Sequence, residues 1–348
     1  MNPKKLRSSE KRKLVFLIVL FIGLCICAFV SIVSGASDLG IIDTVQAILG
    51  AAPERDILIV REIRLPRLLT AVFGGAGLGV AGCILQCVLR NPLASASTLG
   101  ISQGAAFGAA FAIIVLGAGF QSGANLPTFD NPAVIAICAF IGSTTSALTI
   151  LGLSKFRSVS PEAMILCGVG LSALFAGATA MLQYFADEIS VASVVFWTFG
   201  DLGRTAWKET SIIAGIVLIL ASACMFQRWN LNALEYGDQT AHSLGIPVDS
   251  FRLCMLMLCS MAAAVIVSFV GIINFVGLVA PHIARKFVGS AYGYLLPASA
   301  MTGAALLTLS DVAARTIASP ITLPIGAITS LLGAPIFLYL LASGGKFR

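Results

Sequence analysis

The sequence is poor in charge. Only 11% of its 348 residues are Asp, Glu, Lys or Arg, whereas an ordinary soluble domain carries about 25%. The mean hydropathy is +0.96, and several uncharged apolar stretches reach about 18 residues, a length that can cross a bilayer. These values exclude a soluble enzyme and indicate a membrane protein.

A nucleotide-binding motif is also missing. The string G-x-x-x-x-G-K-S/T occurs nowhere, and the only late Gly-Lys pair, Gly345-Lys346, is followed by Phe347. A P-loop needs that string because its backbone amides and its lysine hold the phosphates. We therefore expect no ATP hydrolysis by this chain and assign no catalytic residue. There is no basic cluster beside a folded polar domain, so nucleic acid is not an expected partner.

Metal ligands and proton-relay groups are scarce. The only histidines, His242 and His282, lack a ligand partner at helical spacing, and no pair of acids lies inside an apolar segment as in a proton-coupled carrier. All nine cysteines lie in apolar segments, where their spacing favours neither zinc nor disulfides. No metal or cofactor is expected. Asp311 and Arg315 are four residues apart, so a helical ion pair is expected there.

Apolar segments of membrane length are abundant. Ten are expected, and the short eighth is set apart from the seventh by glycines around Gly271 and Gly277. They cover residues 14–34, 68–89, 100–118, 133–153, 163–185, 211–227, 253–273, 275–288, 294–310 and 324–342. The predicted fold class is an all-α polytopic membrane protein with about ten transmembrane helices, in which residues 1–348 form a single transmembrane domain.

The distribution of charge orients these segments, because Lys and Arg accumulate on the cytoplasmic side. With both termini cytoplasmic, 15 of the 22 Lys and Arg residues lie inside, among them the basic N-terminus at residues 1–13. The net charge of +6 then divides into +10 inside and −4 outside. The first segment also resembles a signal peptide, but its apolar run exceeds the usual length of about 7 to 15 residues. We expect it to be retained as the first span.

Seven basic residues lie on the outer side, where the rule disfavours them. They are Arg55, Arg61, Arg64, Arg67, Arg204, Lys208 and Arg315. Pro66 suits the first turn of a helix, so Arg64 and Arg67 are expected to flank a helix start, where cations oppose the helix dipole. Two interpretations remain: docking of acidic side chains from an outer partner, or anchoring to lipid headgroups.

Small residues follow in the next two segments. The run Gly74 to Gly79 and the series Gly100, Gly104 and Gly108 predict close approach of helix backbones. Between these segments, Asn91-Pro92 is expected to end the first of the two helices.

The longest polar inner loop covers residues 229–251. Its apolar residues suit two short amphipathic helices broken at Gly237 and ended by Gly245 and Pro247. Such a loop either offers a surface to a cytoplasmic partner or packs on its own membrane domain.

Together these strings resemble the FecCD permease family, the membrane subunits of ATP-driven importers for iron-siderophore complexes, haem and vitamin B12. The matching strings are RLPR from Arg64, RNPLASASTLGISQGAAFG from Arg90, YGDQTAHSLGI from Tyr236, GIINFVGLVAPHIAR from Gly271, SDVAAR from Ser310 and LPIGAITSLLGAPIFLYLL from Leu323. They occur in order over most of the chain.

The resemblance implies a permease subunit in a bacterial or archaeal plasma (inner) membrane. It implies a second permease subunit, identical or homologous, two ATP-hydrolysing subunits, and a periplasmic or lipid-anchored substrate-binding protein, beside contact with membrane lipid. Iron-siderophore is the expected cargo, with haem or vitamin B12 as the alternative. An ion-coupled secondary transporter and a receptor-like membrane protein are alternatives of other classes.

The resemblance also implies roles for particular residues. It assigns docking of the binding protein to Arg64, Arg67 and Arg315. It assigns coupling to the ATPase to Gly237, Asp238, Ala241, His242, Ser243, Leu244 and Gly245. It assigns the inner gate to Asn91 and Leu93, with Pro161 and Glu162 opposite. Met164, Met181 and Gln183 could line the pore, although helix packing explains them equally well.

Overall fold

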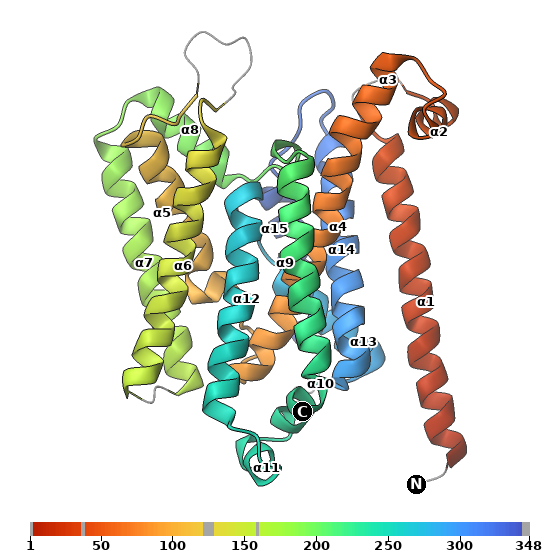
Figure 1. Ribbon diagram of the computed structural model, residues 1–348, viewed down its shortest axis with the longest axis vertical. Helices are drawn as coiled ribbons and strands as arrows, with labels where there is room; N and C mark the ends of the chain where they lie inside the picture. Colours follow the sequence, from red (N-terminus) through yellow and green to blue (C-terminus); the bar gives the residue numbers. More distant parts are fainter. Residues whose placement is uncertain (1–2, 36–38, 121–128, 158–159, 343–348) are drawn as a thin grey trace.

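A computed structural model describes residues 3–35, 39–120, 129–157 and 160–342 (Figure 1). No β-strand forms within these ranges. The long helices are α1 (Pro3–Val33), α4 (Leu65–Val88), α6 (Pro132–Arg157), α7 (Pro161–Tyr184), α9 (Trp207–Phe226), α12 (Val248–Val270) and α14 (Tyr292–Thr316). Shorter helices are α2 (Ile41–Leu49), α3 (Glu54–Leu58), α5 (Ile101–Ile114), α8 (Glu188–Thr198), α10 (Arg228–Glu235), α11 (Asp238–Ser243), α13 (Val276–Val288) and α15 (Ile325–Ala342). A π-helical segment (Ile59–Arg64) and two 3-10 turns, η2 (Ser97–Leu99) and η3 (Leu202–Arg204), complete the elements.

Every one of the ten expected apolar segments coincides with a helix, so the predicted fold class is confirmed. Within the described residues, seven helices are long and apolar enough to cross a membrane. The other three expected segments correspond to the shorter helices α5, α13 and α15.

Helix α8 was not expected. It begins after Asp187, whose carboxylate accepts hydrogen bonds of 3.1 Å from the backbone amides of Ile189 and Ser190. Hydrogen bonding by Ser190, first through its side chain, holds the pKa of Asp187 below its ordinary value. At 11 residues, α8 is too short to span a bilayer alone.

Glycines bring the central helix α4 against its neighbours. A methyl group on Gly75 would meet the backbone of Gly303 in α14, and one on Gly82 would meet the backbone of Gly277 in α13. Helices in lipid associate through close packing of small residues. These glycines therefore explain why 78% of the residues in the most apolar 18-residue stretch of the helix that contains α4 are buried. The packing role predicted for this glycine run is confirmed.

Helices α5 and α6 pack in the same manner. A methyl group on Gly104 would meet the backbone of Gly142, and one on Gly108 would meet the carbonyl of Cys138. The glycine series of the third segment therefore also serves packing.

The entry into α4 differs from the prediction. Helix α3, the π-helical segment and α4 form one continuous stretch from Glu54 to Val88, so Arg64 and Arg67 do not flank a helix start. A proline within a helix clashes with the carbonyl four residues earlier. Pro66 is the second residue of α4, and the wider π-helical segment that ends at Arg64 precedes it.

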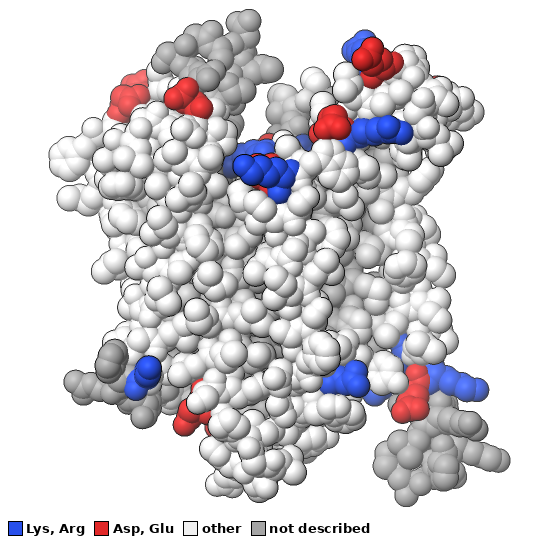
Figure 2. Space-filling view, in the orientation of Figure 1, with Lys and Arg blue, Asp and Glu red and all other residues white. Residues whose placement is uncertain are grey.

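Charged side chains gather at the two ends of the molecule. Figure 2 shows a broad band without charge between them, as expected for a surface in contact with lipid tails. The start of α1 and the pair α10–α11 lie at one end, and α2, α3 and α8 lie at the other (Figure 1).

Candidate functional site

The end of the molecule at which α2, α3 and α8 lie is predicted to face outward and is called the outer end. It contains a buried ion-pair cluster centred on Asp311, whose side chain is 0% exposed. Its Oδ1 lies 2.9 Å from Arg67 and its Oδ2 lies 2.9 Å from Nε of Arg315. Oδ1 of Asp201 lies 3.5 Å from Nη2 of Arg67, the same nitrogen that contacts Asp311. The predicted Asp311–Arg315 ion pair is confirmed, and Arg67 joins it from α4.

Two of the outer arginines hold the end of α1. Arg64 donates hydrogen bonds to the carbonyls of Ile32 at 2.7 Å and Val33 at 3.0 Å. Arg315 donates to the carbonyl of Ser31 at 3.1 Å, to its hydroxyl at 2.9 Å, and to the carbonyl of Ser34. The last carbonyls of a helix lack partners within it and carry partial negative charge, so both guanidinium groups stabilise the C-terminal end of α1.

These contacts give Arg64, Arg67 and Arg315 a structural role that the sequence did not reveal. Their exposure is small, with the residue Arg64 at 7% and the side chains of Arg67 and Arg315 at 14% and 11%. Docking of a binding protein at these arginines stays a prediction.

The opposite end, predicted to be cytoplasmic and called the inner end, carries the helix pair α10–α11, as predicted from its turn residues. Gly237 (φ +118°) separates the helices and Gly245 (φ +81°) follows them, both in backbone conformations that favour glycine. Leu231, Leu234 and Ala241 are buried against the membrane helices.

The same helix pair also presents an open surface. Tyr236 and Leu244 are 81% and 67% exposed, and His242, Ser243 and Gly245 are exposed beside them. Both interpretations of this loop therefore hold in part, because one face packs on its own domain and the other remains available to a partner.

Carboxylates on either side of Gly237 attach the pair to different membrane helices. Glu235 accepts a hydrogen bond of 3.0 Å from the hydroxyl of Tyr292 in α14. Asp238 accepts from Arg252 in α12 at 2.9 Å and pairs with Arg90 at 2.7 Å, directly beyond α4. A movement of α10–α11 is thereby connected to α4, α12 and α14.

The predicted gate residues lie at the inner ends of α4 and α7. Asn91 accepts a hydrogen bond of 2.8 Å from the backbone amide of Leu93, which is 44% exposed. Pro161 and Glu162 are the first residues of α7. The hydroxyl of Ser160, directly before them, accepts a hydrogen bond from the backbone amide of Ala163. The chain that follows the Asn91–Leu93 segment approaches α7 farther along, since a methyl group on Gly168 would meet the Thr98 carbonyl.

The candidate pore residues differ in exposure. Met164 is 3% exposed and belongs to the hydrophobic core, which favours helix packing. Met181 is 62% exposed and Gln183 is half-buried, so both side chains are open to a path or partner beside α7.

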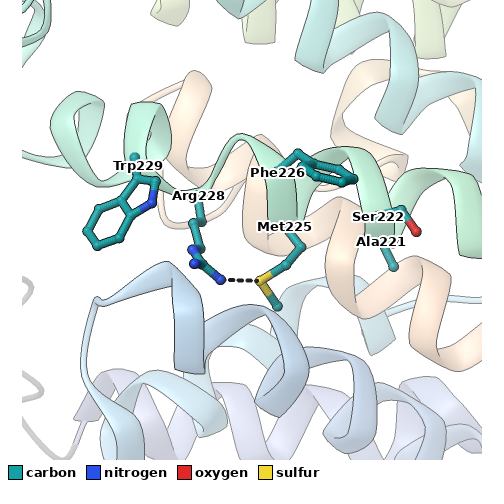
Figure 3. A pocket seen from close by; sticks show the side chains of 6 residues that line it. All are labelled: Ala221, Ser222, Met225, Phe226, Arg228 and Trp229. Carbon is teal, nitrogen blue, oxygen red and sulfur yellow. Dashed lines mark hydrogen bonds between the residues drawn. The ribbon is translucent and has the colours of Figure 1, made fainter.

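An open hollow of about 570 Å³ lies at the inner end of α9 (Figure 3). Arg228 lies 5.5 Å from the ring of Trp229 and 3.8 Å from the sulfur of Met225. Ala221, Ser222 and Phe226 complete its lining. An arginine beside an exposed tryptophan is typical of the membrane–water interface.

Membrane-length helices and a broad band without charge define a polytopic membrane protein. A family model described as the FecCD transport family matches residues 23–343. The chain belongs to this family, which confirms the resemblance inferred from the sequence.

Similar proteins align with this chain over nearly its whole length. Protein MJ0087 of Methanocaldococcus jannaschii, a proposed ABC transporter permease, is 45% identical over 339 residues covering 97% of each chain. The Fe(3+)-citrate import system permease protein YfmE of Bacillus subtilis is 35% identical over 340 residues, covering 97% of this chain and 98% of its own. The hemin transport system permease protein HmuU of Yersinia pestis is 33% identical over 329 residues, covering 92% and 95%.

A solved structure has the same fold. It is described as an inward-facing conformation of a proposed metal-chelate type ABC transporter, with 30% identity and a TM-score of 0.81 over 94% of this chain and 99% of that one. The protein is thus a multi-pass membrane permease subunit of the ABC importer class. Family membership implies ATPase, substrate-binding and second permease components.

Proposed function

We propose that this permease carries an iron-siderophore or related iron chelate into the cytoplasm. The observation that supports the cargo class is the similarity over 97% of the chain to an iron-citrate permease. Haem is the second candidate, because the haemin permease of Yersinia pestis is similar over 92% of the chain. Vitamin B12 remains the third candidate within the family.

A transport panel tests the cargo. The permease, with its ATPase and binding protein, is reconstituted in liposomes and offered ferric citrate, a ferric hydroxamate, haemin or vitamin B12. We expect ATP-dependent uptake of a ferric chelate with little uptake of the other two classes. Uptake of haemin or vitamin B12 alone would contradict the iron-chelate proposal while leaving the permease class intact.

ATPase coupling is proposed for the exposed side of α10–α11. The residues assigned to it are Gly237, Asp238, Ala241, His242, Ser243, Leu244 and Gly245. Leu244 supports this role, because it is an apolar side chain that is 67% exposed at a polar end of the molecule. A cytoplasmic partner that buried it would gain apolar contact area.

A second permease subunit is proposed to face α7. Only 11% of the residues in its most apolar 18-residue stretch are buried. A methyl group on Gly170 or Gly177 would meet nothing within 4 Å. Met181 and Gln183 would then line the path between the subunits, and Asn91, Leu93, Pro161 and Glu162 would close its inner end.

Docking of the substrate-binding protein is proposed at Arg64, Arg67 and Arg315. Arg67 pairs with Asp201 and Asp311, Arg315 pairs with Asp311, and Arg64 binds the end of α1. Guanidinium groups at this end of the molecule would attract acidic side chains of a partner. Arg64→Gln tests this with less disturbance than Arg67→Glu, which would place a carboxylate against Asp311. We expect weaker docking at low salt; unchanged affinity and transport in a folded Arg64→Gln variant would contradict the assignment.

A further inference from the structure

Arg90 occupies a backbone position that normally takes glycine. Its φ of +48° lies in the left-handed region, which side chains other than glycine rarely adopt. The backbone amides of Arg90 and Asn91 donate to the carbonyls of Cys87 at 3.1 Å and Gln86 at 3.2 Å. This is the hydrogen-bond pattern of a Schellman motif, in which glycine is the usual residue at the left-handed position.

The side chain of Arg90 gives a reason for its presence there. Its guanidinium lies 2.7 Å from Oδ1 of Asp238, the first residue of α11. A glycine at position 90 would relax the backbone but lose this ion pair. The chain therefore retains an unfavourable conformation at the residue that directly precedes the gate segment Asn91–Leu93.

Arg252 binds the same carboxylate from a buried position. Its Nη2 lies 2.9 Å from Oδ1 of Asp238, and its Nε donates to the carbonyl of Val88 at 2.7 Å. Its side chain is 6% exposed, whereas that of Asp238 is 33% exposed. One buried guanidinium thus bonds both to the last turn of α4 and to the first residue of α11, with little solvent to replace either contact.

We propose that Arg90, Asp238 and Arg252 form a mechanical link through which displacement of α11 by the ATPase moves the gate segment Asn91–Leu93; this inference rests on the proposed ATPase coupling. Asp238 acts as a positioning residue, since it holds the chain on both sides of Leu89 without lining the path. When α11 shifts, Asp238 pulls Arg90 directly and the end of α4 through Arg252.

Labelling of the gate segment in the assembled transporter tests the link. Leu93→Cys is introduced, and its reaction with a water-soluble maleimide is compared between the nucleotide-free complex and the complex trapped with ATP and vanadate. The same permease without that cysteine gives the background from native thiols. Transport per ATP hydrolysed is measured alongside, because a role limited to folding would not change that ratio in correctly assembled complexes.

The variants separate charge from backbone strain. Asp238→Asn removes the carboxylate charge, and Arg90→Asn removes the guanidinium while keeping a residue that tolerates the left-handed conformation. Asp238→Glu keeps the charge. Asp249→Asn is the matched control, because Asp249 also faces Arg252, at 3.7 Å, but is 91% exposed.

We expect Arg90→Asn to lower the nucleotide-dependent change in labelling by about fivefold or more, while the ATPase subunits still copurify and hydrolyse ATP. Asp238→Asn should lower the change in labelling as well, and Asp238→Glu should keep more of it than Asp238→Asn does. Asp249→Asn should behave as the parent chain. An unchanged labelling response and an unchanged transport ratio in Arg90→Asn would overturn the link, even if Asp238→Asn failed to assemble. A parent complex that assembles but neither hydrolyses ATP nor transports would instead contradict the proposed function.

Discussion

At the residue scale, the arginines on the outer side illustrate what local spacing can and cannot reveal. The Asp311–Arg315 pair follows from a four-residue separation on one helix. Arg67 and Asp311 lie 244 residues apart in the chain, and the bonds from Arg64 to the end of α1 span 31 and 32 residues. Contacts of this kind depend on how helices pack, which hydropathy and spacing do not specify.

Asp311→Asn should destabilise the protein strongly. Removing the buried charge takes away the carboxylate that pairs with both Arg67 and Arg315 and leaves Arg67 with only the partly exposed Asp201, a change that costs about 3–5 kcal/mol. Unfolding of the detergent-solubilised protein by dodecyl sulfate measures the effect. Asp201→Asn is the control, because Asp201 is 41% exposed and its ion pair should contribute about 0.2–1 kcal/mol; equal losses in both variants would contradict the central place of Asp311.

At the element scale, the apolar segments were predictable because hydropathy is a local property. The breaks around α10–α11 were predictable for the same reason, because glycines at 237 and 245 indicate helix ends. The π-helical turn before Pro66 and the short helix α8 were not predicted. The π-helical turn was missed because Pro66 indicates a helix start by its sequence, whereas the helix continues through it. Helix α8 was missed because its apolar run is shorter than a membrane span.

Gly82→Ala should disturb the contact between α4 and α13. The added methyl group would meet the Gly277 backbone, which cannot move aside as a side chain can, and overpacking of this kind costs about 1–3 kcal/mol. Gly215→Ala in α9 is the matched control, because its methyl group would meet nothing within 4 Å and alanine favours helix by up to about 1 kcal/mol. Equal stability of the two variants would show that close approach of these backbones is unimportant.

At the scale of the whole molecule, the uneven division of charge predicts the orientation in the membrane. The start of α1 and the pair α10–α11 lie at the same end (Figure 1), as the prediction of a cytoplasmic N-terminus and loop requires. Only a few basic residues oppose the rule, and three of them, Arg64, Arg67 and Arg315, have partners within the protein.

Cysteine labelling tests this orientation. Ser243→Cys, in the exposed part of α11, should react with a membrane-impermeant maleimide only after the cell membrane is opened. Arg55→Cys, near the start of the continuous helix at the opposite end, should react in intact cells, because the charge distribution places it outside. The reverse pattern, measured against the background of the parent chain, would overturn the orientation.

The most direct test of the account is uptake of a radioactive ferric chelate into liposomes that contain the permease, with the ATPase and binding protein present or omitted. The account predicts accumulation only when all three components and ATP are present, and no loss of uptake on addition of an uncoupler. Accumulation that persists without the ATPase but collapses with the uncoupler would contradict it and would identify an ion-coupled secondary transporter.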